Sequence, residues 1–196
     1  VNANLDAAKD VELPKRYVVF YGRIGEEKGI RSLMQIWDDS SLNDVPLVVM
    51  GAGPLEDEFS EWAKKKDNVL FLGYTQHDKC LGIVKNSEFV VFPSIWYEGC
   101  SMVEIEAESL GKALIATDLG FSAEIIENGV NGYKVPLGNV TDFVETILKL
   151  WNNPTKCVEM GKNARRDYES KFLPTDNYAQ LINIYSSRIT AKTNEI

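Results

Sequence analysis

The stretch YVVFYGRIGEEKG, residues 17–29, decides the fold class. Its first five residues are β-branched or aromatic and would be apolar on both faces of a strand, which Gly22 ends. A helical pattern follows from Gly29 to about Asp38, with apolar residues on one face. A strand that is apolar on both faces is covered on both faces, as in a parallel sheet. The stretch therefore predicts a buried parallel strand, a short loop and a covering helix.

The same strand-loop-helix pattern repeats along most of the chain. Strands are expected at 17–21, 46–50, 69–72, 89–92 and 113–116, with 132–135 as a candidate sixth. Helices are expected at 29–38, 55–66, 78–85 and 101–110, and Pro154 and Pro174 divide the helical remainder, 139–189, into three. This alternation, with right-handed crossovers, predicts an α/β fold with a Rossmann-like doubly wound parallel sheet.

The composition excludes several classes of protein. The 196 residues include 29 acidic and 21 basic side chains, a formal net charge of −8, which argues against a nucleic-acid-binding surface. The apolar runs are far shorter than the roughly 20 residues of a membrane-spanning helix. Cys80, Cys100 and Cys157 lack the spacing of a disulfide framework or zinc site and indicate a reducing compartment. The start at Val1 shows no signal peptide and fits a piece of a longer protein.

The carboxyl ends of the expected strands are where such folds bind ligands. The loop after the first strand, residues 22–29, places Arg23 and Lys28 at that edge. Arg can hold a phosphate through two hydrogen bonds and Lys adds a compact positive charge, so this loop is a candidate phosphate site. The alternative is a solvated loop whose cations pair locally with Glu26 or Glu27.

The loop after the second strand reads Gly51-Ala52-Gly53-Pro54. Two glycines between a strand and a helix allow a ligand to approach the backbone closely. The third glycine of the dinucleotide-binding pattern is absent, since Glu56 stands in its place, and this argues against NAD. A tight strand-to-helix turn explains the same residues equally well.

The segment after the fourth strand, residues 94–107, contains the strongest candidate site. Glu98 is expected in the loop before a helix and Glu106 in the second turn of that helix, so both carboxylates can approach one ligand. Amides at a helix start form a ready site for a diphosphate, and carboxylates accept hydrogen bonds from sugar hydroxyls. The amides concerned are those of Gly99, Cys100, Ser101 and Met102. The alternative makes Glu98 a helix cap, with Glu104, Glu106 and Glu108 as surface charges.

The ordered set of motifs resembles the C-terminal, donor-binding half of a GT-B-fold retaining glycosyltransferase of family 4. The resemblance runs from about Lys15 to Arg188. It rests on Gly22-Arg23…Lys28-Gly29, Gly51-Ala52-Gly53-Pro54-Leu55, Phe71-Leu72-Gly73-Tyr74, the block 93–107, Gly111-Lys112-Ala113, Thr117-Asp118-Leu119-Gly120 and Asn128-Gly129-Val130-Asn131-Gly132. Each motif alone is weak, whereas the set in this order is specific.

The resemblance implies a role for each site residue. Arg23 and Lys28 would neutralise the diphosphate of a nucleotide-sugar donor, and Glu98 would contact the transferred sugar near its reacting carbon. Glu106 would hold the ribose hydroxyls, and the Tyr74-Thr75 turn would flank the base. Backbone groups would complete the donor site at Gly22, Gly51, Gly99, Cys100, Ser101, Met102 and Val103. Glu98, Arg23 and Lys28 would act in catalysis, with no cofactor and no metal.

The resemblance also implies an organisation. Residues 1–14 would form a lead-in, 15–173 the donor-binding domain, 174–190 a helix that crosses back to an N-terminal domain outside this sequence, and 191–196 a tail. The implied partners are a UDP- or GDP-sugar and an acceptor sugar or lipid-linked sugar held by that other domain, with no nucleic acid. The parent protein is expected in the cytoplasm, with peripheral membrane association left open, in polysaccharide, lipopolysaccharide or glycolipid biosynthesis. The fragment alone is expected to be inactive.

Other interpretations stay open beside this one. A GT-B-related sugar phosphorylase, a nucleotide-sugar epimerase, or a non-catalytic donor-binding module with a partner chain would have the same half. Cys100 stands where the family commonly has an aromatic residue, and Ser101 stands where it commonly has Gly or another small residue. Because of these two departures, the shape of the sugar pocket is left open. Phe121-Ser122 replaces a frequent glycine-containing turn. His77, the single histidine, is expected in a loop or helix cap near the base-side turn.

Overall fold

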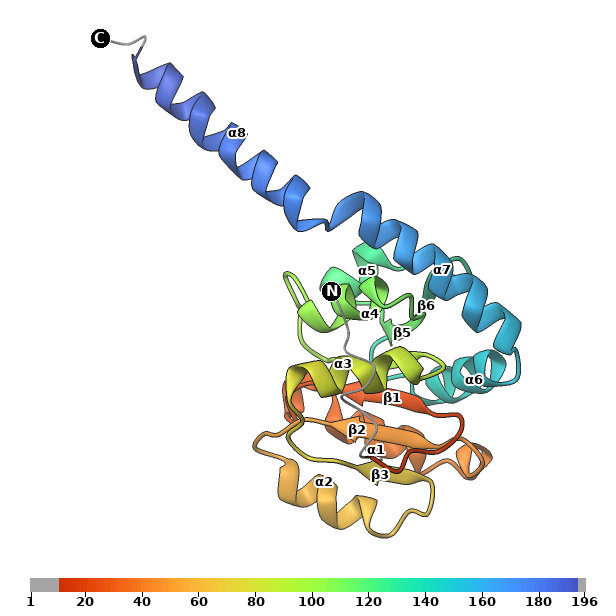
Figure 1. Cartoon of the computed structure of the whole chain (residues 1–196). Helices are drawn as coiled ribbons and strands as arrows, with labels where there is room; N and C mark the ends of the chain where they lie inside the picture. Colours follow the sequence, from red (N-terminus) through yellow and green to blue (C-terminus); the bar gives the residue numbers. More distant parts are fainter. Residues whose placement is uncertain (1–10, 194–196) are drawn as a thin grey trace.

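Within residues 11–193, which the computed structural model describes, six short strands form one parallel sheet (Figure 1). The strands are β1 (Val18–Tyr21), β2 (Leu47–Met50), β3 (Val69–Phe71), β4 (Val90–Phe92), β5 (Leu114–Thr117) and β6 (Gly132–Val135). Their order across the sheet is β3-β2-β1-β4-β5-β6, and every pairing is parallel. The order reverses between β1 and β4, so the loops after these two strands flank the topological switch point where such sheets bind ligands.

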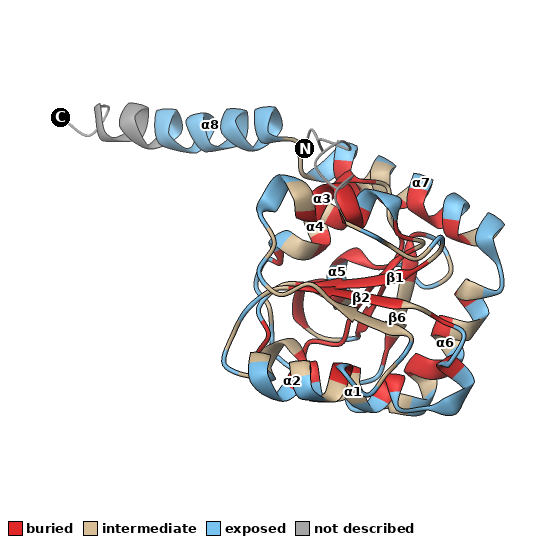
Figure 2. Ribbon diagram, turned by 60° about the horizontal axis from the view of Figure 1, so that its bottom comes forward, coloured by how far each residue is buried: buried red, intermediate tan, exposed pale blue. Residues whose placement is uncertain are grey.

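Helices cover both faces of the sheet, and Figure 2 shows the buried strands between α1 and α2 on one side and α3 and α4 on the other. The helices are α1 (Ile30–Trp37), α2 (Glu56–Ala63), α3 (His77–Asn86), α4 (Met102–Ser109), α5 (Gly120–Ile125), α6 (Val140–Trp151), α7 (Pro154–Lys171) and α8 (Pro174–Thr193). Every residue of β1, β2, β4 and β5 is buried. Cover on both faces explains why these strands are apolar throughout rather than at alternate positions.

The fold class predicted from the sequence is confirmed, and each predicted strand is confirmed to within one residue at its ends. The candidate sixth strand at 132–135 is confirmed as β6. The sequence analysis missed α5 and two short 3-10 helices at Glu26–Lys28 and Ser40–Leu42. These elements have six residues or fewer, which is too short for a helical period to show in the sequence.

The two ends of the chain differ in how far the structure describes them. Residues 1–10 of the expected lead-in and 194–196 of the expected tail lie outside the described residues. Residues 11–14 form no helix or strand, and Val11 and Leu13 pack half-buried against the core. α8 begins at Pro174, as expected, and continues to Thr193, past the expected end near residue 189.

The last helix, α8, extends away from the rest of the molecule (Figure 1). Its large apolar side chains are 42% to 66% exposed, namely Tyr178, Leu181, Ile182, Ile184 and Tyr185. None of the helices in the described part of the chain combines the length and apolar character that a bilayer crossing requires. The expectation that 174–190 crosses back to another domain stays a prediction.

Candidate functional site

A cavity of about 400 Å³ lies at the carboxyl edge of the sheet, and we call it the switch-point cavity. Its volume suits a small organic ligand. Its lining comes from the ends of the first three strands and their loops, from α3 and from α4: Tyr21, Gly22, Arg23, Met50, Gly51, Ala52, Tyr74, Thr75, His77, Cys80, Met102, Val103 and Glu106.

Most of the predicted site residues line this cavity. They are Gly22, Arg23, Gly51, Tyr74, Thr75, Met102, Val103 and Glu106. The remaining predictions are not in its lining but in the loops after β1 and β4: Lys28, Glu98, Gly99, Cys100 and Ser101. The sequence analysis missed Tyr21 and Cys80. It considered Met50 and Ala52 only as parts of the strand end and turn around Gly51, and it placed His77 near the base without a ligand contact. Position at the carboxyl end of a strand was the available signal for Tyr21 and Met50.

The glycines after β2 allow two loops to pack backbone to backbone. A Cβ on Gly51, whose φ is +144°, would lie 1.8 Å from the carbonyl oxygen of Gly22. A Cβ on Gly53 would lie 2.5 Å from the carbonyl oxygen of Ile24. The Ile24 amide also donates to the Ala52 carbonyl at 3.0 Å. The tight-turn interpretation therefore accounts for Gly53, while Gly51 serves both the packing and the cavity lining.

The loops after β1 and β4 touch at the switch point. A Cβ on Gly29, whose φ is +71°, would lie 1.8 Å from the carbonyl oxygen of Pro93. Across the same contact Lys28 and Glu98 form an ion pair, with only 20% and 15% of their side chains exposed. These partners are 70 residues apart in sequence, so no local pattern could predict the pair. The contact makes the two loops one unit.

Arg23 is the more exposed cation of the predicted phosphate loop. Its Nε lies 3.4 Å from Glu27 Oε1, and 63% of its side chain is exposed. The local pairing left open by the sequence is therefore observed for Arg23, whereas Lys28 pairs with Glu98 instead. An exposed ion pair stabilises a fold only slightly, so Arg23 can exchange Glu27 for a ligand anion at small cost.

The start of α4 presents amide groups without a protein acceptor. Ser101 is the N-cap residue, and no side chain caps the helix, so the alternative of Glu98 as a cap is wrong. The amides of Gly99, Cys100, Met102 and Val103 donate no hydrogen bond to any residue that the structure describes. Such groups carry the positive end of the helix dipole and bind anions.

The helix that the sequence analysis missed, α5, holds the backbone of Glu98. The Phe121 amide donates to the Glu98 carbonyl at 2.9 Å, and a Cβ on Gly120 would lie 2.7 Å from the same oxygen. Phe121 and Ser122, whose effect the sequence left open, are buried at this contact. A glycine at 120 is thus required for α5 to approach the loop that carries Glu98.

Glu106 supplies a carboxylate at the cavity, with 13% of its side chain exposed. Its Oε1 lies 3.5 Å from Nε2 of His77 at the first turn of α3. Burial raises the pKa of Glu106, and the neighbouring His77 opposes that rise. The Tyr21 hydroxyl donates to the Val103 carbonyl at 2.6 Å and so ties the first turn of α4 to the end of β1. Glu106 is therefore placed to accept hydrogen bonds from ligand hydroxyls.

Glu104 and Glu108 lie in the interior, so the alternative that made Glu104, Glu106 and Glu108 surface charges is wrong. Burial raises the pKa of Glu104 to about 6 and that of Glu108 to about 8. The Ser101 and Ser122 hydroxyls are near enough to moderate the rise in the pKa of Glu104. Neither Glu104 oxygen completes a hydrogen bond with a described residue.

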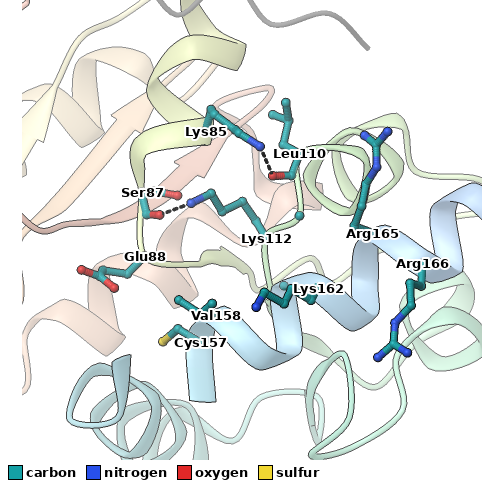
Figure 3. Close-up of a pocket in the computed structure, with 12 residues that line it drawn as sticks. Lys85, Ser87, Glu88, Leu110, Lys112, Cys157, Val158, Lys162, Arg165 and Arg166 are labelled. Atoms are coloured by element: carbon teal, nitrogen blue, oxygen red, sulfur yellow. Dashed lines mark hydrogen bonds between the residues drawn. The ribbon is translucent and has the colours of Figure 1, made fainter. Parts of the chain in front are cut away.

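A second cavity, of about 580 Å³, opens at the other edge of the sheet (Figure 3). Its lining precedes β4 and β5 or lies in α7, remote from the loops that carry the predicted site residues. In the part of the chain that is described, no group of three or more His, Cys, Asp or Glu side chains is arranged to hold a metal ion.

The sequence matches a known family over most of its length. A family model described as "Glycosyl transferases group 1" matches residues 2–167. The O-antigen chain mannosyltransferase C of Escherichia coli is 27% identical over 181 residues, 90% of this chain and 48% of its own. The D-rhamnosyltransferase WbpZ of Pseudomonas aeruginosa is 30% identical over 165 residues, 82% of this chain and 42% of its own. The chain thus spans about half the length of the curated relatives it matches.

Solved structures share the fold. A variant of TarM from S. aureus, in complex with Fondaparinux, alpha-GlcNAc-glycerol and UDP, has a TM-score of 0.77 and 25% identity, covering 90% of this chain and 38% of its own. HepE of Anabaena in complex with UDP has a TM-score of 0.78 and 22% identity, covering 88% and 49%. The C-terminal domain of LpcC from Francisella tularensis, a glycosyl transferase group 1 family protein, has a TM-score of 0.74 and 21% identity, covering 88% and 94%. The sheet is thus the Rossmann-like fold of GT-B glycosyltransferases.

Proposed function

The chain belongs to the group 1 glycosyl transferases, and from this premise we propose that it is the donor-binding half of a longer enzyme. That enzyme would transfer a sugar from a nucleotide-sugar to an acceptor with retention of anomeric configuration. The chain covers only 48% and 42% of two glycosyltransferases that it resembles, which supports a second domain that would hold the acceptor. The similarity to an O-antigen chain mannosyltransferase supports an acceptor in surface polysaccharide biosynthesis.

One observation carries the proposal: three kinds of ligand-binding group meet at the switch-point cavity. Arg23 offers a guanidinium from the loop after β1, the first turn of α4 offers unpaired amides, and Glu106 offers a carboxylate one turn further along α4. A nucleoside diphosphate presents the complementary groups, since its phosphates accept hydrogen bonds and its ribose hydroxyls donate them. The diphosphate would therefore lie at the start of α4 and the ribose at Glu106.

The base would lie against the turn at Tyr74 and Thr75. Tyr74 is 77% exposed, and the Thr75 hydroxyl is engaged with the Gly73 carbonyl at 3.3 Å. Selection of the base would therefore depend on backbone groups more than on these side chains. The TarM and HepE structures contain UDP, which supports UDP over GDP as the first nucleotide to test.

Lys28 would change its partner when the donor binds. It pairs with Glu98 in the structure, and both side chains are mostly buried, so neither charge is stable there alone. A diphosphate beside α4 would attract the Lys28 ammonium and leave Glu98 to accept a hydrogen bond from the transferred sugar. During transfer the leaving nucleotide gains negative charge, which Arg23, Lys28 and the α4 amides would stabilise. On this proposal no divalent metal is needed.

The test is calorimetric titration of the chain with UDP, GDP and ADP, with and without Mg²⁺. We expect one nucleotide to bind without a metal. Arg23→Ala and Glu106→Ala should each weaken that binding about tenfold, because each removes a charge-assisted hydrogen bond. Lys64→Ala and Glu61→Ala are the matched controls, since these exposed side chains lie at the carboxyl end of α2 and are not among the residues that line the cavity.

Three outcomes would contradict the proposal. Unchanged affinity in both Arg23→Ala and Glu106→Ala would place the nucleotide elsewhere. Sugar transfer by the isolated chain at the rate of the full-length parent would show that no second domain is needed. Transfer by the parent that required inorganic phosphate would instead favour a sugar phosphorylase.

A further inference from the structure

The cavity at the amino-terminal edge of β4 and β5, which we call the basic pocket, lies across the sheet from the switch-point cavity. Figure 3 shows its walls: Lys85 at the end of α3, Glu88 and Lys112 in the turns before β4 and β5, and Lys162 on α7. Its volume of about 580 Å³ is within the range of small-molecule sites.

The basic pocket concentrates positive charge in a chain whose formal net charge is −8. Its cations are Lys85, Lys112, Lys162, Arg165 and Arg166, against one carboxylate, Glu88. Glu88 is already paired with Arg16 at 2.6 Å, and Arg165 is paired with Glu169 at 2.7 Å. None of the three lysines forms an ion pair with a residue in the described part of the chain. Among the described residues, the pocket thus holds more cations than carboxylates to pair with them.

Two of the lysines are fixed in the pocket by backbone oxygens. Lys85 Nζ donates to the Leu110 carbonyl at 3.0 Å, and Lys112 Nζ donates to the Ser87 carbonyl (Figure 3). An ammonium group has three donors, so each keeps donors for a ligand. Burial, together with the neighbouring Lys85, lowers the pKa of Lys112 to about 8, and Glu88 opposes this shift. A bound anion would stabilise the charged form of Lys112.

Lys162 differs from Lys85 and Lys112, whose hydrogen bonds to backbone carbonyls also stabilise the fold. It lies on α7, its side chain is exposed, and Figure 3 shows it pointing to the side of the pocket that Glu88 and Val158 line. Arg166 points away from the centre in the same view, and Arg165 is engaged by Glu169 and by the Ser109 carbonyl, so the ligand-facing set is the three lysines. These lysines come from three separate elements, α3, the turn before β5 and α7, that only the fold brings together.

We propose that the basic pocket is a second ligand site, distinct from the donor site, that binds a phosphate group. Lys85, Lys112 and Lys162 supply point charges and N–H donors, which suit a phosphate monoester or diester. The ligand is either a soluble phosphorylated compound or the phosphate of an anionic lipid headgroup. The pocket lies on the opposite edge of the sheet from Arg23 and Glu106, so occupancy of one site leaves the other accessible.

The test uses the ¹⁵N-labelled chain and inorganic pyrophosphate, followed by NMR. We expect saturable shifts of the amides of Gly111, Lys112 and Gly161, which line the pocket. Lys112→Gln and Lys162→Gln should each weaken this binding about tenfold, because each removes a charge-assisted contact. Lys162 is exposed on a helix, so its variant keeps the fold even if Lys112→Gln does not. Lys64→Gln removes the same charge at a remote exposed site and should leave the binding unchanged.

Three further measurements make the outcome decisive. Arg23→Ala should leave the shifts of Gly111 and Gly161 unchanged, and Lys162→Gln should leave nucleotide affinity unchanged. Co-sedimentation with phosphatidylcholine vesicles that contain phosphatidylglycerol, lost in Lys162→Gln, would assign the lipid headgroup, whereas pyrophosphate binding without vesicle binding would assign a soluble ligand. Absence of saturable shifts at Gly111, Lys112 and Gly161, or equal binding by the wild-type chain and Lys162→Gln, would overturn the proposal.

Discussion

The two edges of the sheet use cationic side chains in opposite ways. At the carboxyl edge each cation has a carboxylate partner, Lys28 with Glu98 and Arg23 with Glu27. At the amino edge Lys85 and Lys112 donate only to backbone carbonyls. The carboxyl edge also offers unpaired amides at the start of α4, whereas the amino edge is built from turns that precede strands.

This difference bears on how each edge would hold an anion. At the carboxyl edge a phosphate must compete with Glu27 and Glu98, so binding exchanges one counter-ion for another and stays reversible. At the amino edge an anion would meet Lys85, Lys112 and Lys162, which form no ion pair within the described part of the chain, so binding adds an interaction rather than replacing one. We therefore expect turnover at the first edge and longer occupancy at the second.

The largest effect on stability is expected from a substitution at the contact between the loops after β1 and β4. Gly29→Ala should lower the free energy of unfolding by about 4 kcal/mol, because strain at positive φ adds to a steric clash. The new Cβ would lie 1.8 Å from the Pro93 carbonyl oxygen at a residue whose φ is +71°. Urea denaturation monitored by tryptophan fluorescence measures the change.

Gly129→Ala is the matched control for this prediction. Gly129 also has positive φ, +81°, but a Cβ there meets no atom within 4 Å. Its cost should be only the backbone strain, about 1 kcal/mol. Equal costs for the two variants would show that the loops after β1 and β4 do not form one rigid unit.

The next largest effect is expected on the pH dependence of stability, from a buried glutamate on α4, the helix that runs from one edge of the sheet to the other. Glu108 is buried there, and burial raises its pKa to about 8 from an ordinary value of 4.5. The folded chain therefore binds more protons than the unfolded chain between these pH values, and stability falls as pH rises through this window. Glu108→Gln should remove that loss and raise the melting temperature by about 5 °C at pH 8.5.

The same variant should show little gain at pH 4.5, where Glu108 is protonated in the folded chain. Glu145→Gln, an exposed change on α6, should leave the melting temperature unchanged at both pH values. A Glu108→Gln variant that is less stable than the wild-type chain at pH 8.5 would mean that the carboxylate has a stabilising partner in solution.

The sequence predicts the carboxyl edge better than the interior or the amino edge. Strands such as 18–21 are apolar at every position, and ligand residues follow them directly in the chain, so local patterns were enough. Glu104 and Glu108 were placed at the surface in one alternative because charge alone was considered, whereas α4 is buried on the face that bears them. Helix α5 was missed because six residues cannot show a helical period.

Contacts between distant segments account for the rest of what the sequence did not predict. The Lys28–Glu98 pair joins residues 70 positions apart, and His77 meets Glu106 across two helices. The basic pocket has no motif at all, because its lysines come from three elements. Spacing along a chain identifies groups on one loop or helix face, and it carries no information about contacts between residues that are distant in sequence.

A smaller effect is expected on UDP affinity when the carboxylate of Glu98, at the carboxyl edge, is removed. Glu98→Gln removes the carboxylate that competes for Lys28, so UDP should bind the chain about fivefold more tightly. In the full-length parent the same change should lower sugar transfer, because Glu98 would no longer contact the transferred sugar as a carboxylate. Calorimetry and a transfer assay measure the two effects.

Glu88→Gln is the control for this comparison, since it removes a carboxylate of similar exposure at the amino edge. It should leave UDP affinity unchanged. If Glu98→Gln left UDP affinity unchanged or weakened it, Lys28 would not be the group that exchanges partners, and the proposed counter-ion exchange at the carboxyl edge would fail.

The smallest effect is a ligand-dependent change in labelling rate, measured on a native thiol at each edge. Cys100 is exposed beside the start of α4, while Cys157 is buried in the lining of the basic pocket. Burial raises the pKa of Cys157 to about 11, so its reactive thiolate is scarce at neutral pH. Iodoacetamide, a neutral reagent, should therefore label Cys100 more than about tenfold faster than Cys157. Mass spectrometry of the digested chain measures both rates.

UDP should then change the labelling rate of the thiol at the carboxyl edge and not that of the thiol at the amino edge. UDP should slow the labelling of Cys100 about twofold, because a diphosphate at the start of α4 covers the loop without contacting the sulfur. UDP should leave the slow labelling of Cys157 unchanged, since that thiol lies across the sheet from the nucleotide. Equal protection of both thiols by UDP would mean that the nucleotide stabilises the whole fold rather than occupying one edge. Protection of Cys157 alone would mean that UDP binds in the basic pocket at the amino edge and not beside α4 at the carboxyl edge.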